Sequence, residues 1–207
     1  MNSRERLLTV LRGGIPDSVP CSPDTSNMIP CRLTGKPFWD IYLYQDPPLW
    51  KAYLDAVKYF GFDSLMDGYF PLQFPEERKP EEECWKEYIV KKSDEEIVTQ
   101  RCFEDGRVKR WEHGVRVYRR ADPPLTTVPE TVHLPPEPER YEPVEGVRQW
   151  PSGEELLKRV KEEMGDHGLV GVWCGTSLFI NNEEEVLDYY DNPGKYRERA
   201  EKCLAES

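Results

Sequence analysis

The 207-residue sequence lacks a long apolar run, and its first residues lack the features of a signal peptide. No apolar stretch approaches the roughly 18 residues that a membrane-spanning helix needs. Arg4, Glu5 and Arg6 stand where a signal peptide would need an apolar segment. These absences argue against a membrane partner, and we expect a cytoplasmic protein.

The sequence also lacks the residue spacings of common metal sites. Its six cysteines form no CxxC pair, and its three histidines form no HxxxH arrangement. Zinc ribbons, zinc fingers and HExxH enzymes depend on such spacings, so we expect no metal site within this chain. In a cytoplasmic protein, cysteines without ligand spacing are expected to be reduced thiols, buried as small apolar side chains.

An excess of basic residues is missing as well. The chain has 28 Lys and Arg against 39 Asp and Glu, which opposes nonspecific binding to nucleic acid. One segment is locally basic, and it contains Arg101, Arg107, Lys109, Arg110, Arg116, Arg119 and Arg120. Two interpretations remain open for it: a solvated strand face, or a surface that guides an anionic ligand or an acidic partner protein.

Three short apolar runs are present, at 18–22, 63–67 and 169–175, and each ends in a polar or glycine-bearing turn. Helical patterns accompany these runs, which is typical of a parallel βα protein. A helix N-cap is predicted at Asn2, and Asp46 is the expected cap of a second helix that runs to Phe60. Further helices are predicted to begin near Ser152, Glu183 and Pro193.

Between Tyr69 and Trp150 the periodicity changes to that of strands. Strands are predicted over 87–90 and 95–103 and around Val115 to Tyr118, with a hairpin turn at 104–107 and a proline-rich extended connection after them. This segment, 69–150, is predicted to be an antiparallel insertion. The expected fold class is α/β, a partial (β/α)8 barrel of the TIM type interrupted by that insertion, because a complete barrel takes about 250 residues. A smaller α/β fold is the alternative.

Five short motifs occur in a fixed order along the chain: Ser3 to Leu8, Pro16 to Pro20, Tyr59 to Asp63, Gly171 to Phe179 and Asp191 to Pro193. In order and approximate spacing they resemble the N-terminal part of the uroporphyrinogen decarboxylase (URO-D) superfamily. The later strands of that (β/α)8 barrel have no counterpart here. The resemblance therefore implies that 1–207 is a single, incomplete barrel domain.

The superfamily contains two main chemistries. True uroporphyrinogen decarboxylases hold the acidic side chains of a tetrapyrrole with an arginine-rich loop after the first strand, whereas the corresponding segment here, 22–35, has Arg32 alone. One arginine neutralises many carboxylates poorly. The chain is thus nearer the other branch, methyltransferases that transfer a methyl group to or from a corrinoid protein. Corrinoid and zinc are cofactors implied for the complete enzyme and not for this chain.

The expected function is accordingly methyl transfer involving a corrinoid, with a small molecule or a corrinoid protein as substrate. A uroporphyrinogen-type decarboxylase acting on a tetrapyrrole is one alternative. A second alternative is a non-catalytic fragment, or one half of a split enzyme whose barrel a partner chain completes.

Candidate site residues follow the ends of the expected parallel strands, where barrels carry their chemistry. Asp67 is the candidate catalytic residue, because its place resembles the aspartate that contacts pyrrole nitrogens in the decarboxylases; a cap of the following turn is the alternative role. The candidate substrate-binding residues are Arg32, Tyr69, Cys174, Gly175, Thr176 and Ser177. The last four are small, and a glycine among them lets a ligand approach the backbone; a plain strand-to-loop turn is the alternative.

Overall fold

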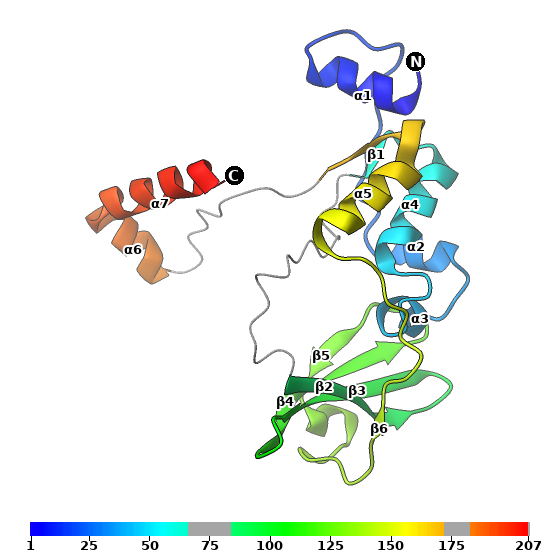
Figure 1. Ribbon diagram of the computed structural model, residues 1–207, viewed down its shortest axis with the longest axis vertical. Coiled ribbons are helices and arrows are strands. Elements are labelled where there is room, and N and C mark those ends of the chain that lie inside the picture. The colour runs from blue at the N-terminus through cyan, green and yellow to red at the C-terminus, as the bar shows by residue number, and fades with distance from the viewer. Residues whose placement is uncertain (66–83, 172–182, 207) are drawn as a thin grey trace. The chain divides into compact units, whose positions relative to one another are not determined.

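The computed structural model describes residues 1–65, 84–171 and 183–206, with side chains up to Lys202 (Figure 1). Contacts divide the chain into two units, 1–171 and 172–207, and each unit is described by itself. The first unit is a mixed α/β structure with a five-stranded antiparallel sheet, a short parallel strand pair and several helices. Within the described residues, no helix has both the length and the apolarity needed to cross a bilayer.

The first helix is α1 (Ser3–Leu11), and the sequence predicted its start correctly. The Asn2 side chain accepts a hydrogen bond from the Glu5 N–H at 2.8 Å, and the Glu5 side chain accepts one from the Asn2 N–H at 3.1 Å. This reciprocal pair satisfies two of the N–H groups that a helix start leaves unpaired.

Three helices follow: α2 (Met28–Leu33), α3 (Phe38–Tyr42) and α4 (Leu49–Phe60). Helix α4 ends at Gly61, whose φ of 70° is the left-handed conformation that glycine adopts without strain. The prediction that Asp46 caps this helix is wrong, because the N-cap is Pro48 and no side chain caps the helix start. Asp46 instead pairs with Lys36 at 3.0 Å and with Arg148 at 3.1 Å.

The apolar core of the helical part lies between α4 and α5 (Gly153–Met164). Trp50, Tyr53 and Leu54 of α4 are buried there together with Leu156 and Val160 of α5. A short 3₁₀ helix, η4 (Gly165–His167), connects α5 to the next strand. Both helices also cover the parallel strand pair, because Leu65 and Val170 belong to the same core.

The parallel pair consists of β1 (Ser64–Leu65) and β7 (Leu169–Val170), with Ser64 opposite Leu169 and Leu65 opposite Val170. The sequence predicted both runs as strands. The expected strand over 18–22 is not formed, since the structure has no regular strand there. Pro20 has no N–H to give to a ladder, which limits the pairing. The segment nevertheless lies against β1, because the Asp63 N–H donates to the Cys21 carbonyl at 2.8 Å.

The predicted antiparallel strands are confirmed. Its strands are β2 (Trp85–Lys92), β3 (Glu96–Glu104), β4 (Lys109–Arg119), β5 (Leu125–Thr127) and β6 (Glu142–Pro143), in the spatial order β5-β4-β3-β2-β6 (Figure 1). One face of this sheet packs on α3, where Ile89, Ile97 and Tyr118 meet Trp39 and Tyr42. The other face packs on the 3₁₀ helix η3 (Pro129–Val132), through Val98, Val115 and Val117.

The second unit contains α6 (Glu183–Asp191) and α7 (Pro193–Glu206), close to the predicted ranges. The Tyr196 hydroxyl of α7 donates to the Asp188 carboxylate at 2.9 Å, and Lys195 pairs with the same carboxylate at 2.6 Å. These contacts lower the pKa of Asp188 to about 2, with the bond from Lys195 as the main cause. The two helices are thus joined by one charged contact group.

Candidate functional site

The carboxyl ends of the parallel strands are the first place to look for a site. Because β1 and β7 are parallel and in register, their last residues, Leu65 and Val170, lie at one edge of the pair. The predicted residues Asp67, Tyr69, Cys174, Gly175, Thr176 and Ser177 belong to 66–83 and 172–182, outside the described residues. The expected approach of Asp67 to Arg32 or Tyr69 therefore stays a prediction.

Arg32 is the one predicted site residue that the structure describes. It lies in the last turn of α2 and is exposed. In the described part of the chain its guanidinium forms no ion pair, while the backbone carbonyl of Arg32 accepts a hydrogen bond from Gly35 at 3.1 Å. Its charge is therefore available to an anionic ligand.

A buried carboxylate that was not among the predicted site residues, Asp63, lies just before β1. Asp63 is 3 % exposed, and its two oxygens accept bonds from the Cys21 N–H and from Arg6, both at 2.7 Å. Burial alone would raise the pKa of Asp63, but the bonds from Cys21, Ser3 and Arg6 outweigh it and hold that pKa below its usual value. Arg6 also bonds Asp17 at 2.8 Å. Asp63 thus connects α1 and the Cys21 segment to the start of β1.

The buried thiol of Cys31, in the helical part, is not suited to a reactive role. The Cys31 thiol is fully buried in α2, and burial raises its pKa to about 11 despite a hydrogen bond with Tyr42. It is protonated at neutral pH and is a poor nucleophile. No group of three or more His, Cys, Asp or Glu side chains within the described residues is placed to hold a metal ion.

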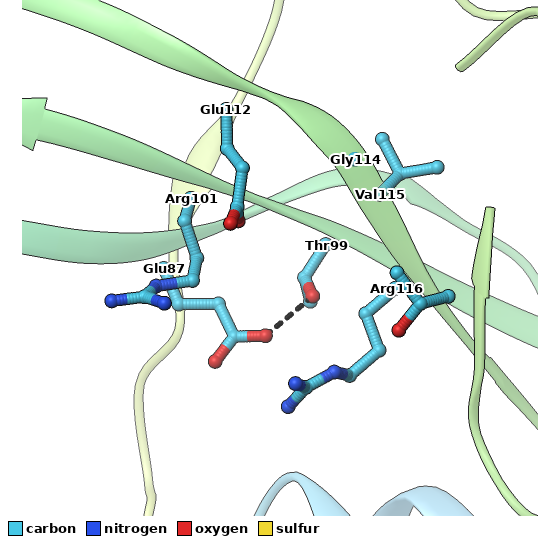
Figure 2. A pocket seen from close by; sticks show the side chains of 8 residues that line it. Glu87, Thr99, Arg101, Glu112, Gly114, Val115 and Arg116 are labelled. Carbon is cyan, nitrogen blue, oxygen red and sulfur yellow. Dashed lines mark hydrogen bonds between the residues drawn. The ribbon is translucent and has the colours of Figure 1, made fainter. Parts of the chain in front are cut away.

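A second candidate site is a hollow of about 100 Å³ on the five-stranded sheet (Figure 2). Strand alternation and register put part of its lining on one face, since Glu87 of β2 is opposite Arg101 of β3, and Thr99 of β3 is opposite Arg116 of β4. Glu112, Gly114 and Val115 of β4 and Thr126 of β5 also line the hollow. The face that carries Glu87 and Thr99 is the one that α3 covers farther along the strands.

Hydrogen bonds hold one of the acidic side chains in place. The Glu87 carboxylate accepts a bond from the buried Thr99 hydroxyl at 2.5 Å and another from the Tyr118 hydroxyl at 3.2 Å. Burial is the main cause that raises the pKa of Tyr118 to about 12, and the negative charge of Glu87 adds to it. The pKa of Arg116 is raised, mainly by its hydrogen bond with Tyr118 and further by the nearby Glu87 and Glu112 carboxylates.

Comparison of the chain with protein-family models, with curated proteins and with solved structures found no match. Assignment to a family therefore depends on the sequence motifs and on the arrangement of the parallel segments.

The sequence pointed to part of the hollow on the sheet. Arg101 and Arg116 belong to the basic cluster for which an anionic ligand was one interpretation. Glu87, Glu112 and Gly114 were missed, because their convergence depends on the pairing of three strands. One signal was present: Gly114 interrupts a strand pattern, and such a glycine often marks a close approach of a ligand or of another backbone.

Proposed function

We propose that the parallel segments of this chain are the first strands of a URO-D-type (β/α)8 barrel. The supporting observation is that β1 contacts both the segment that precedes it and the strand that follows it in the chain. Asp63 bonds Cys21, and the N–H groups of Leu169 and Gly171 of the β7 segment donate to the carbonyls of Asp63 and Leu65 at 3.2 and 2.8 Å. In a barrel, successive parallel strands are neighbours in this way.

The helices support the same proposal. Helix α4 leads into β1, α5 leads into β7, and both contribute to the core that covers the pair. A parallel pair with a helix before each strand is the repeating unit of a (β/α)8 barrel. The five-stranded sheet is then an insertion between the second and third of these units.

For the activity we propose methyl transfer that involves a corrinoid, with Asp67 as the catalytic residue and with Arg32, Tyr69, Cys174, Gly175, Thr176 and Ser177 as substrate-binding residues. Arg32 is the single arginine of the segment between Ser22 and Gly35, so a tetrapyrrole with many carboxylates would remain largely unpaired. Zinc is assigned to none of the described residues, since they contain no suitable group of ligands.

The test is an anaerobic titration of the chain with hydroxocobalamin, followed by absorbance, and separately with the colourless uroporphyrinogen, followed by calorimetry. We expect a saturable change in the corrinoid spectrum and no saturable heat with uroporphyrinogen. The Asp67→Asn and Arg32→Gln variants should weaken the response by about tenfold, the equivalent of one lost polar contact. Arg12→Gln, at an exposed arginine that caps α1, is the matched control.

Each other outcome is informative. A response to uroporphyrinogen alone would support the decarboxylase alternative. An unchanged corrinoid spectrum, or equal weakening by Arg12→Gln, would contradict the proposed activity.

A further inference from the structure

The hollow on the five-stranded sheet is lined in part by a glycine, Gly114, which lies in the interior of an 11-residue strand. The register of β4 on β3 shifts between Val115 and Trp111, so Glu112, His113 and Gly114 have no partners in the ladder, and Glu112 and Gly114 line the hollow beside Arg116. The backbone at Gly114 is not left-handed, and an added Cβ would be 3.7 Å from Thr126 and 3.8 Å from the Thr127 carbonyl, ordinary contact distances. A side chain would therefore fit, and its absence creates the hollow.

The charges around the hollow are mixed, and no direct ion pair joins them within the described residues. Glu87 and Glu112 face Arg101 and Arg116, and none of the ion pairs in the described part of the chain joins any two of these four. The Glu112 carboxylate forms no hydrogen bond within the described residues, although the Glu112 backbone carbonyl accepts one from Gln100 at 2.7 Å. Figure 2 shows the four side chains around the same space.

The position of Arg101 explains why Arg101 and Glu87 form no ion pair. Arg101 is directly opposite Glu87 in the strand register, where oppositely charged side chains normally pair. Instead, the Arg101 guanidinium lies over the Trp85 ring, 5.1 Å from its centroid. Stacking of this kind fixes the guanidinium plane and leaves its edge N–H groups free for a ligand.

The lining therefore offers two anionic and two cationic groups to one small space. A simple anion would be attracted by the arginines but repelled by the glutamates. A simple cation would be attracted by the glutamates but repelled by the arginines. A molecule with both an ammonium and a carboxylate group is attracted by the glutamates and by the arginines. About 10–15 Å³ of such space holds one water, so the 100 Å³ hollow accepts a molecule of a few heavy atoms.

From this arrangement we propose that the hollow over Gly114 binds a small zwitterion of the α-amino-acid class. The ligand ammonium is held by Glu87 and Glu112, and its carboxylate by Arg101 and Arg116. The site lies on the antiparallel insertion, so it is independent of the barrel and of the methyl transfer proposed above.

The experiment uses free glycine and its two halves as probes. The ¹⁵N-labelled chain is titrated with glycine, with acetate and with methylammonium, and the amide shifts of 99–101 and 112–116 are followed by NMR. We expect glycine to saturate these shifts with a dissociation constant of about 1 mM or tighter. Acetate and methylammonium should each have a dissociation constant at least about tenfold higher, because each is attracted by one set of charges and repelled by the other.

Two variants locate the site. Gly114→Val fills the hollow with a residue suited to strands and should abolish the response to glycine. His113→Val, at the neighbouring exposed residue that does not line the hollow, is the matched control and should respond as the original chain does. Glu112→Gln provides a second test, since it keeps the shape, and it should weaken glycine binding by about tenfold.

Three results would overturn the proposal. Acetate that binds as tightly as glycine would show a site for anions only. Undiminished glycine binding to Gly114→Val, in a chain that keeps its native spectrum, would place the ligand elsewhere. The absence of saturable shifts with all three probes would show that the hollow binds no ligand of this class.

Discussion

Asp63 should determine how the stability of this protein depends on pH. The substitution Asp63→Asn keeps the size of the side chain but removes its charge and replaces one accepting oxygen with a donating NH₂. Two bonds of 2.7 Å, from Arg6 and from the Cys21 N–H, are affected. A hydrogen bond to a charged group contributes about 1.5–3 kcal/mol. Because Arg6 is partly exposed and keeps its bond to Asp17, we expect a loss of about 2 kcal/mol in the free energy of unfolding at pH 7.

The sign of the pH dependence follows from the lowered pKa of Asp63. The unfolded chain takes up the proton near pH 4, before the folded protein does, so protons favour unfolding below that pH. The stabilisation by Asp63 is therefore complete above about pH 4 and is lost as the pH falls toward the folded pKa. The difference between the original chain and Asp63→Asn should shrink over the same range.

Urea unfolding followed by tryptophan fluorescence, at pH 7 and in steps down to about pH 3, measures this difference. The Asp17→Asn variant is the control, because Asp17 also bonds Arg6 but is 41 % exposed, and its effect should be smaller. A loss below about 0.5 kcal/mol for Asp63→Asn, which is typical of surface substitutions, would refute the reasoning. A loss that does not change with pH would refute the part that depends on charge.

Three further predictions concern packing and thiol chemistry. An added Cβ at Gly168 would lie 2.5 Å from the backbone carbonyl oxygen of Asp63. Gly168→Ala should therefore lower the free energy of unfolding, measured with urea, by about 1–3 kcal/mol. The control Gly194→Ala, where space is open, should lower it less. Leu156→Ala removes a fully buried side chain between α4 and α5, and calorimetry should show a loss of about 2–5 kcal/mol. Burial raises the pKa of Cys31 to about 11, so Cys31 should react with iodoacetamide at pH 8 far more slowly than the exposed Cys21. Site-resolved mass spectrometry measures both rates, and equal rates would contradict the burial of Cys31.

The helix limits were predictable because their signals are local. The Asn2 and Glu5 pair and the left-handed Gly61 act within a few residues of the helix ends that they define. The antiparallel sheet was predictable for a similar reason, since the strands β3 and β4 alternate in sequence and are joined by a short turn. In both cases the residues that decide the structure are neighbours in the chain.

The segment 18–22 and Asp46 show where local signals fail. The apolar run 18–22 has the composition of a strand, but Pro20 limits its pairing and leaves it with bonds between Cys21 and Asp63. Asp46 precedes a helix as a cap would, yet Lys36 and Arg148 attract its carboxylate, and Arg148 is distant in the chain. A charged partner outside the local window thus overrides the capping preference.

The candidate sites illustrate the same limit at a larger scale. Arg101 and Arg116 belong to a basic cluster that is visible in the sequence, whereas Glu87 is brought to them by the register of β2 on β3. A shift of that register by one residue would move Glu87 to the opposite face of the sheet. The hollow is therefore a property of strand pairing that composition cannot reveal.

The amino edge of the parallel pair is tightly packed, and this packing bears on the proposed barrel. At the amino edge, Asp63 is buried and fully bonded, and Gly168 is in close contact with the backbone of Asp63. Such contacts stabilise the strands and leave little room for a ligand. In (β/α)8 enzymes, residues at the amino edge serve stability and residues at the carboxyl edge serve chemistry. The tight packing at the amino edge of this pair agrees with that division, so under the barrel proposal the reaction site belongs to the carboxyl edge of the strands.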